Sequence, residues 1–334
     1  MALAPACADE VLQPVTASVW QEAVVSVTDI DRTARFFTEI GGYEEKWRGV
    51  VDPTEIAAWG LPEMASGEAL LLGPAGQDTG LLRLVRFDDA GYKEPTRPGA
   101  RTWDTGCYFS LMVRMKDMQA IYDDAIAMGW WTETPITYLE FGESKLNVMV
   151  FRGPDGVQVQ GYERLAPPLP DSIPPFERFT RPFNAMQMVR DRDASYAFYT
   201  EILGFDTFYK GKPYVAAEPK HTPLGIPLNL TTTARYQAGI VYPKAGEFGR
   251  MEMIEMMDLD GRDHAERCNA PNLGFLAVRF PVPDADAAAA NIEQRGGMID
   301  RDAAPVLLPP YGEVQLFNIK TPDGANIHFF ERAM

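Results

Sequence analysis

The chain has 334 residues, with 31 basic and 47 acidic side chains and a formal net charge of −16. This length predicts about two domains, and the acidity argues against nucleic acid or an anionic membrane surface as a partner. No apolar run is long enough to predict a transmembrane helix. The N-terminal segment lacks the pattern of a signal peptide, and three cysteines without a C-x-x-C spacing do not make a disulfide framework. We therefore expect a cytoplasmic protein.

The first predicted elements are a strand over residues 22–28 and a helix that begins after Asp29. The carboxylate of Asp29 suits the N-cap position, and Gly41 and Gly42 end the helix in a left-handed turn that glycine tolerates. Strand-like segments follow at 43–50, 68–72 and 81–87, which completes a β-α-β-β-β unit. A second unit starts near residue 106, with a helix over 117–128 and a last strand over 157–162.

The second half of the chain repeats the first. Residues 24–44 (VVSVTDIDRTARFFTEIGGYE) match residues 186–206 (MQMVRDRDASYAFYTEILGFD), and 154–164 (PDGVQVQGYER) match 322–332 (PDGANIHFFER). The proline-rich stretch 165–182 lies between the halves and predicts a linker. We expect an N-terminal extension at 1–19, a first domain at 20–164 and a second at 183–334, each holding two units.

The strand–Asp–helix opening, the FYTEILGF segment and the closing Pro-Asp-Gly hairpin resemble the vicinal oxygen chelate superfamily. This superfamily includes glyoxalases, bleomycin-resistance proteins and extradiol dioxygenases. The resemblance implies an α+β fold in which four βαβββ units form two half-open β-barrel domains in tandem. It also implies a metal or substrate site on the concave face of a barrel.

The resemblance places ligand positions on the first and last strands of each unit. In domain 1 these positions fall on Glu22, Arg83, Tyr108 and Gln160. A guanidinium stays charged at neutral pH and would repel a cation. We therefore expect no metal in domain 1, and we expect Glu22 and Arg83 to pair in one substrate-binding concavity with Tyr108 and Gln160.

In domain 2 the same positions fall on Asn184, Glu252, Phe275 and His328, and we place the catalytic site here. His328 and Glu252 would move a proton, Asn184 would donate to a developing oxyanion, and Phe275 would contact substrate. Two interpretations of the cofactor stay open. One is a weak divalent-metal site on His328 and Glu252; the other, favoured because catalytic metals normally need three protein ligands, is no metal.

Two long inserts, 48–67 and 210–247, interrupt the units and are rich in aromatic residues and prolines. Long insertions in compact domains are often lids or binding loops, and packing between the domains is the alternative. If the second insert is a lid, Tyr214 or Tyr242 would cover the domain 2 site.

Three functions are compatible with these features. The first is a glyoxalase-like enzyme of the lyase or isomerase type that acts on a small carbonyl or oxygenated compound in domain 2. The second is a metal-free small-molecule-binding protein that resembles bleomycin-resistance proteins. The third is an extradiol-type ring-cleaving dioxygenase, which ranks last because Asn184 and Phe275 stand where that chemistry needs histidines. All three imply a small-molecule ligand, and a homodimer stays open.

Overall fold

The computed structural model describes residues 12–99 and 101–332. The order of its elements confirms the four predicted units. The first unit comprises β1 (Glu22–Ser26), α1 (Ile30–Arg35), the π-helical turn η1 (Phe36–Ile40), β2 (Glu44–Val50), α2 (Pro53–Ala58), β3 (Ser66–Gly73) and β4 (Leu81–Asp88). The second comprises β5 (Tyr108–Arg114), α3 (Met118–Ala127), β6 (Thr137–Phe141), β7 (Ser144–Arg152), η2 (Pro154–Gly156) and β8 (Gln158–Ala166).

The second half of the chain repeats this order. The third unit comprises β9 (Asn184–Met188), α4 (Arg192–Ala197), η3 (Phe198–Ile202), β10 (Asp206–Lys210), η4 (Leu228–Leu230), β11 (Tyr236–Tyr242) and β12 (Arg250–Met256). The short helix η5 (Ala265–Arg267) precedes the fourth unit, which comprises β13 (Gly274–Pro281), α5 (Ala285–Gln294), β14 (Ile299–Leu307), β15 (Glu313–Lys320) and β16 (Asn326–Arg332).

Local side chains account for the repeated strand–helix opening. Asp29 accepts a hydrogen bond from the backbone N–H of Arg32 at 2.9 Å, and Asp191 accepts one from Ala194 at 2.9 Å. Both are N-caps, as predicted. The helices end at Gly42 and Gly204, whose φ angles of 75° and 70° lie in the left-handed region. The sequence therefore specifies where each of these helices starts and stops.

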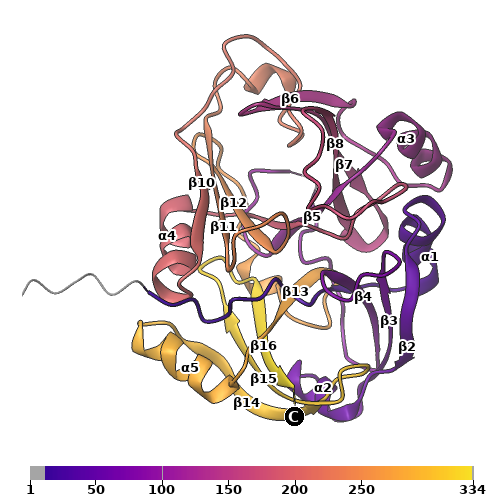
Figure 1. The fold of residues 1–334 in the computed structure, drawn as a ribbon, viewed down its shortest axis with the longest axis vertical. Coiled ribbons are helices and arrows are strands. Elements are labelled where there is room, and N and C mark those ends of the chain that lie inside the picture. The colour runs from indigo at the N-terminus through magenta and orange to yellow at the C-terminus, as the bar shows by residue number, and fades with distance from the viewer. Residues whose placement is uncertain (1–11, 100, 333–334) are drawn as a thin grey trace, which may run out of the picture.

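The units combine into two eight-stranded sheets. One, which we call the 1/4 sheet, has the order β14-β15-β16-β13-β1-β4-β3-β2, and the other, the 2/3 sheet, has the order β10-β11-β12-β9-β5-β8-β7-β6. In each sheet two units meet along the antiparallel edges of their first strands, β1 with β13 and β5 with β9. Figure 1 shows the 2/3 sheet in the upper part of the molecule and the 1/4 sheet in the lower part.

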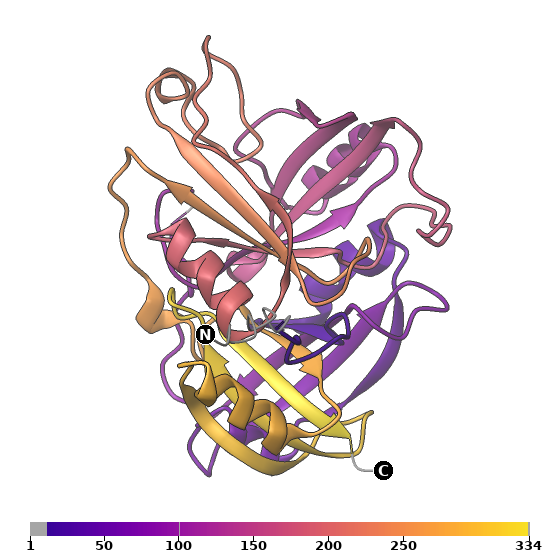
Figure 2. The ribbon, with the colours of Figure 1, turned by 60° about the vertical axis from the view of Figure 1, so that its left-hand side comes forward.

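This pairing corrects our expectation that consecutive units would share a barrel. Each barrel takes one unit from each half of the chain, so the first and last strands of the protein lie in the same sheet. In Figure 2 the yellow C-terminal strands and the purple strands of the first unit occupy the same lower region. The physical reason is that each unit exposes the edge of its first strand, and similar units leave the choice of partner to long-range packing.

Helices and aromatic side chains join the two sheets. The ring of Phe36, in η1, stacks on Trp130, which follows α3, at 3.8 Å between centroids. On the opposite side Phe205 contacts Phe280 at 5.7 Å. One buried apolar cluster includes residues of all four units. The predicted linker therefore does not separate two independent cores.

A disulfide also links the sheets. Cys107 and Cys268 are buried and bonded to each other across 161 residues of chain. Cys107 lies directly before β5 of the 2/3 sheet, and Cys268 lies shortly before β13 of the 1/4 sheet. The cysteine count and spacing had not predicted this bond. The third cysteine, Cys7, lies outside the described residues.

Candidate functional site

The concave face of the 1/4 sheet is filled by a buried charge cluster. Arg83 donates to Glu22 through Nε at 2.7 Å and Nη2 at 3.1 Å. Arg279 donates to the same carboxylate at 2.8 Å and to Glu55 at 2.7 Å. Burial opposes the ionisation of Glu22, but Arg83 and Arg279 outweigh it and hold the pKa of Glu22 below its usual value. Two carboxylates therefore balance two guanidiniums in this cluster.

The first long insert and a loop of the fourth unit close this face. Helix α2, inside the 48–67 insert, brings Glu55 to Arg279, and Glu55 is only 2% exposed. From the loop between β14 and β15, Tyr311 donates to Glu22 at 2.7 Å and the carbonyl of Pro309 accepts from Arg83 at 2.7 Å. The predicted pairing of Glu22 with Arg83 is present, but its setting is a packed interior rather than an open substrate site.

His328 belongs to this closed face. Its Nδ1 accepts from Arg279 Nε at 3.4 Å, and its ring packs on Trp59 at 4.5 Å between centroids. Complete burial, followed by repulsion from Arg279 and Arg301, lowers the pKa of His328 well below its usual value, so the ring is neutral. Since His328 lies in the 1/4 sheet and Glu252 in the 2/3 sheet, our expectation that His328 would converge with Glu252 and Asn184 is wrong.

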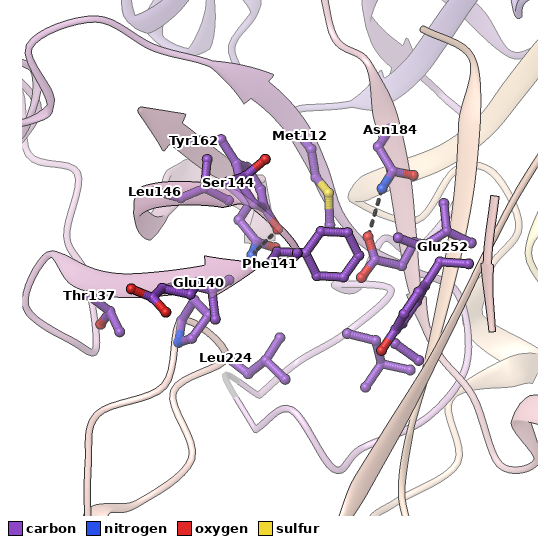
Figure 3. A pocket seen from close by; sticks show the side chains of 18 of the residues that line it. Met112, Thr137, Glu140, Phe141, Ser144, Leu146, Tyr162, Asn184, Leu224 and Glu252 are labelled. Atoms are coloured by element: carbon purple, nitrogen blue, oxygen red, sulfur yellow. Dashed lines mark hydrogen bonds between the residues drawn. The ribbon is translucent and has the colours of Figure 1, made fainter. Parts of the chain in front are cut away.

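The 2/3 sheet, in contrast, has an open pocket of about 840 Å³ on its concave face. Strands β5, β8, β9 and β12 supply its floor, and the β6–β7 hairpin supplies one wall. The second long insert supplies part of the cover through Tyr214 and the 220–224 segment. Figure 3 shows Leu224 and Phe141 at this pocket together with the floor residues Asn184 and Glu252.

Asn184 and Glu252 meet at the floor of the pocket, as predicted. Asn184 Nδ2 donates to Glu252 Oε2 at 2.7 Å, drawn as a dashed line in Figure 3. This is the one hydrogen bond of the Glu252 carboxylate within the described part of the chain. Burial raises the pKa of Glu252 to about 7, while the Asn184 hydrogen bond and the charge of Arg250 act in the opposite direction. The carboxyl group can therefore gain and lose a proton near neutral pH.

Gln160 and Tyr162 complete the polar part of the floor. Both point into the pocket because they are two residues apart on β8. Gln160 Nε2 donates to the Tyr162 hydroxyl at 3.0 Å, which leaves the hydroxyl proton free to donate elsewhere. Burial, and then the nearby charge of Glu252, raise the pKa of Tyr162 well above its usual value. Tyr162 is thus a neutral donor beside a carboxylate.

The donor set of this pocket does not match a firmly held catalytic metal. The corresponding strand positions carry Met112, Gln160, Asn184 and Glu252, which offer one carboxylate, two amides and a thioether. Zinc and iron sites of enzymes use about three histidine, cysteine or carboxylate ligands. Within residues 12–99 and 101–332 no group of three such side chains is placed to hold an ion.

Of the other four predicted substrate contacts, one lines the pocket and three pack elsewhere. Tyr214 lines the pocket, whereas Tyr242 packs against Phe208 at 6.1 Å between ring centroids and is not part of the lining. Tyr108 and Phe275 stack on each other at 4.3 Å in the core. Tyr108 also donates to the backbone carbonyl of Asn326 at 3.0 Å. Neither Tyr108 nor Phe275 reaches a concave face, so the predicted substrate contacts of this pair are wrong.

The sequence contained signals for the residues that we missed. Asp117 and Asp284 cap equivalent helices, and Met112 and Arg279 each lie five residues before them, which marks these two as equivalent to each other. The strand register, which pairs Met112 with Asn184 and Arg279 with Glu22, identifies them as the first-strand positions. We had placed these positions at Tyr108 and Phe275. The alternation of β8 likewise marks Tyr162 as a neighbour of Gln160.

Comparison with known proteins agrees with this architecture. Residues 182–329 match the model of the Glyoxalase/Bleomycin resistance protein/Dioxygenase superfamily. The first half has the same units and completes the same sheets, so the whole chain has the vicinal oxygen chelate architecture in two barrels. A search of curated proteins returned no match.

Solved structures show the same fold over nearly the whole chain. Glyoxalase I from Zea mays has 16% identity and a TM-score of 0.61, covering 94% of this chain and 92% of its own. A putative dioxygenase from Bacillus subtilis has 10% identity and a TM-score of 0.56, with coverage of 96% and 86%. The similarity therefore includes both barrels. Within the described part of the chain, no helix has the length and apolar character needed to cross a membrane.

Proposed function

We propose that the protein is a glyoxalase-like enzyme of the isomerase or lyase type that moves a proton at a carbon beside a carbonyl group. The observation that carries this proposal is Glu252, a buried carboxyl group at the floor of an 840 Å³ pocket whose one hydrogen bond among the described residues comes from a neutral amide. A general base works best when its pKa lies near the operating pH, and Glu252 meets that condition with a pKa of about 7.

Tyr162 and Asn184, which lie beside Glu252, can assist such a proton transfer. The Glu252 carboxylate takes a proton from the carbon, and the C–H electron pair moves to the carbonyl oxygen to give an enolate. Tyr162 donates a hydrogen bond to that oxygen, a role that is worth a few kcal/mol where it occurs. Asn184 fixes the carboxylate through its 2.7 Å hydrogen bond. Return of the proton to the neighbouring carbon or oxygen completes an isomerisation without any further reactant.

The second candidate function is metal-free binding of a small aromatic molecule. Many aromatic side chains line the pocket, namely Tyr138, Phe141, Tyr162, Phe183, Phe208, Tyr209, Tyr214 and Tyr236. Such a lining provides apolar area and ring stacking whether or not chemistry follows. The two functions differ in whether a bound carbonyl compound exchanges its C–H protons.

Hydrogen exchange in D2O tests this difference. The protein is incubated with a panel of small ketones and oxo acids that includes 4-phenyl-2-oxobutanoate and its methyl ester, and deuterium uptake beside the carbonyl is followed by NMR. We expect catalysed exchange with a panel member. Glu252→Gln should slow it by about 10²–10⁴-fold and Tyr162→Phe by a smaller factor.

The matched control is Glu143→Gln, since Glu143 is an exposed carboxylate in the turn between β6 and β7 and is not part of the pocket lining. It should exchange at the wild-type rate. Wild-type exchange in the Glu252→Gln variant would contradict the assigned base. If panel members bind and none exchanges its protons, the enzyme hypothesis is contradicted and the binding-protein hypothesis is favoured.

A further inference from the structure

Three arginines line the same pocket on one side of the carboxylate. Arg114 lies near the end of β5, Arg164 on β8 and Arg250 at the start of β12. Each is on the face of its strand that points into the pocket, because Arg164 follows Tyr162 by two residues and Arg250 precedes Glu252 by two. The guanidiniums therefore form a cationic edge next to the proposed catalytic floor.

These charges are only partly balanced. Arg114 pairs with Glu247 at 2.6 Å, and Arg250 lies 3.6 Å from the same carboxylate. Arg164 has no hydrogen-bond or ion-pair partner among residues 12–99 and 101–332, and its Nε is buried, as is the unpartnered Nε of Arg250. Arg114 and Arg250 thus share one carboxylate and Arg164 pairs with none among the described residues, although an unpaired buried charge is costly.

The arginines also act on one another. Burial lowers the pKa of Arg114 to about 10, Glu247 opposes this change, and Arg250 and Arg164 add to it by repulsion. Burial likewise lowers the pKa of Arg250, and Arg164 contributes repulsion there as well. Aromatic rings support the guanidiniums, with Arg250 3.8 Å from the ring centroid of Phe208. Mutual repulsion in a preformed cradle is relieved when an anion enters.

We propose that Arg164, with Arg114 and Arg250 beside it, binds the carboxylate of the substrate, so that the substrate class is an oxo acid. This inference rests on the proposed function for the identity of the reacting carbon. The planar guanidinium matches a carboxylate through two parallel hydrogen bonds. Lys212 and Lys220, which also line the pocket, add positive charge on the side of the long insert.

The strand geometry limits the size of that substrate. Arg250 and Glu252 are two residues apart, which corresponds to about 7 Å along a strand. A carboxylate held at the arginines then lies only a few bonds from the carbon that faces Glu252. A 2-oxo or 3-oxo acid has this separation between its carboxylate and its acidic C–H. The aromatic lining of the pocket would receive an apolar tail.

The test compares an acid with its neutral ester. Calorimetry measures the Kd of 4-phenyl-2-oxobutanoate and of its methyl ester with the wild type and with Arg164→Met. We expect the wild type to bind the acid 10- to 100-fold more tightly than the ester, and Arg164→Met to lose this preference while its affinity for the ester stays the same. Arg164→Lys keeps the charge and should keep part of the preference.

Arg35→Met is the control, because Arg35 is exposed and outside the pocket. Equal affinity of the wild type for acid and ester would overturn the carboxylate site, as would an unchanged preference in Arg164→Met. If Arg164→Met fails to fold, the ratio of the Kd values for ester and acid in the wild type and in Arg164→Lys still tests the carboxylate site. Glu252→Gln should bind the acid without exchanging its protons, so failure of the carboxylate site and failure of the proposed base give different results.

Discussion

At the scale of single residues, two buried glutamates differ in pKa because their hydrogen-bond partners differ. Glu22 has two arginines and a tyrosine within hydrogen-bond distance, and its pKa is below the usual value. Glu252 has one neutral amide, and burial raises its pKa to about 7. The first carboxylate is an ion-paired part of a packed interior. The second is able to exchange a proton with a bound molecule.

The raised pKa of Glu252 predicts a dependence of stability on pH. An unfolded glutamate titrates near 4.5 and the folded one near 7, so between these pH values the folded protein binds more protons. The contribution of Glu252 to the free energy of unfolding therefore falls as pH rises from about 4.5 to 7, by at most about 3 kcal/mol, and then levels off. Glu252→Gln should abolish this contribution.

Urea unfolding of the wild type and the variant at pH 4.5 and pH 8 measures the effect. We expect the unfolding free energy of Glu252→Gln, relative to that of the wild type, to be higher at pH 8 than at pH 4.5. The Glu143→Gln variant should keep the pH dependence of the wild type, because Glu143 is exposed. A constant difference between wild type and Glu252→Gln at both pH values would be incompatible with a raised pKa.

At the scale of elements, the two long inserts have opposite effects on their barrels. The first contains α2, which carries Glu55 into the 1/4 barrel and pairs it with Arg279. The second passes over the 2/3 barrel and leaves an 840 Å³ pocket below it. The 1/4 barrel is therefore closed because a short helix places a charge inside it. The 2/3 barrel stays open because its insert forms only a cover over the pocket.

Helix α2 offers a direct test of the structural role of the closed barrel. Glu55→Gln removes one of the two carboxylates that balance Arg83 and Arg279, and loss of one partner of a buried ion pair costs about 3 kcal/mol or more. We expect this loss in chemical unfolding. Affinity for 4-phenyl-2-oxobutanoate should remain unchanged, because Glu55 lies outside the pocket. The exposed Glu63, changed to Gln, is the control. Weaker ligand binding in Glu55→Gln with normal stability would show that the 1/4 barrel takes part in recognition.

At the scale of the whole molecule, the two halves of the chain interlock. Each sheet combines one unit from each half, and the Cys107–Cys268 bond connects the residue before β5 of the 2/3 sheet to the segment before β13 of the 1/4 sheet. Unfolding of one half would therefore expose the sheet edges of the other. We expect a single cooperative transition rather than two.

The disulfide should contribute measurably to that transition. Closing 161 residues of chain reduces the entropy of the unfolded state and is worth up to about 5 kcal/mol in the chain-entropy model. The double variant Cys107→Ser, Cys268→Ser should have a Tm lower by several kelvin, as should the wild type after reduction. Thermal unfolding with and without reductant measures both. An unchanged Tm, or free thiols at both positions in the native protein, would contradict the bond.

The repeat and the local patterns determined much of this protein. Asp29, Asp191, Gly42 and Gly204 specify where helices begin and end, because caps and left-handed turns depend on a few adjacent residues. The family resemblance likewise placed Glu22 with Arg83, and Asn184 with Glu252, on the first and last strands of one unit. These are contacts within one unit, where the register of neighbouring strands follows from the pattern of buried side chains.

Only the tertiary structure decided which units meet. His328 and Glu252 occupy matching positions in adjacent units, yet they lie in different sheets, because the first unit pairs with the fourth and the second with the third. The edges of similar units look alike in sequence, so their choice of partner depends on packing between distant segments. The same long-range pairing brings Arg279 to Glu22 and closes one barrel, and it brings Gln160 and Tyr162 to Asn184 and Glu252 in the barrel that stays open.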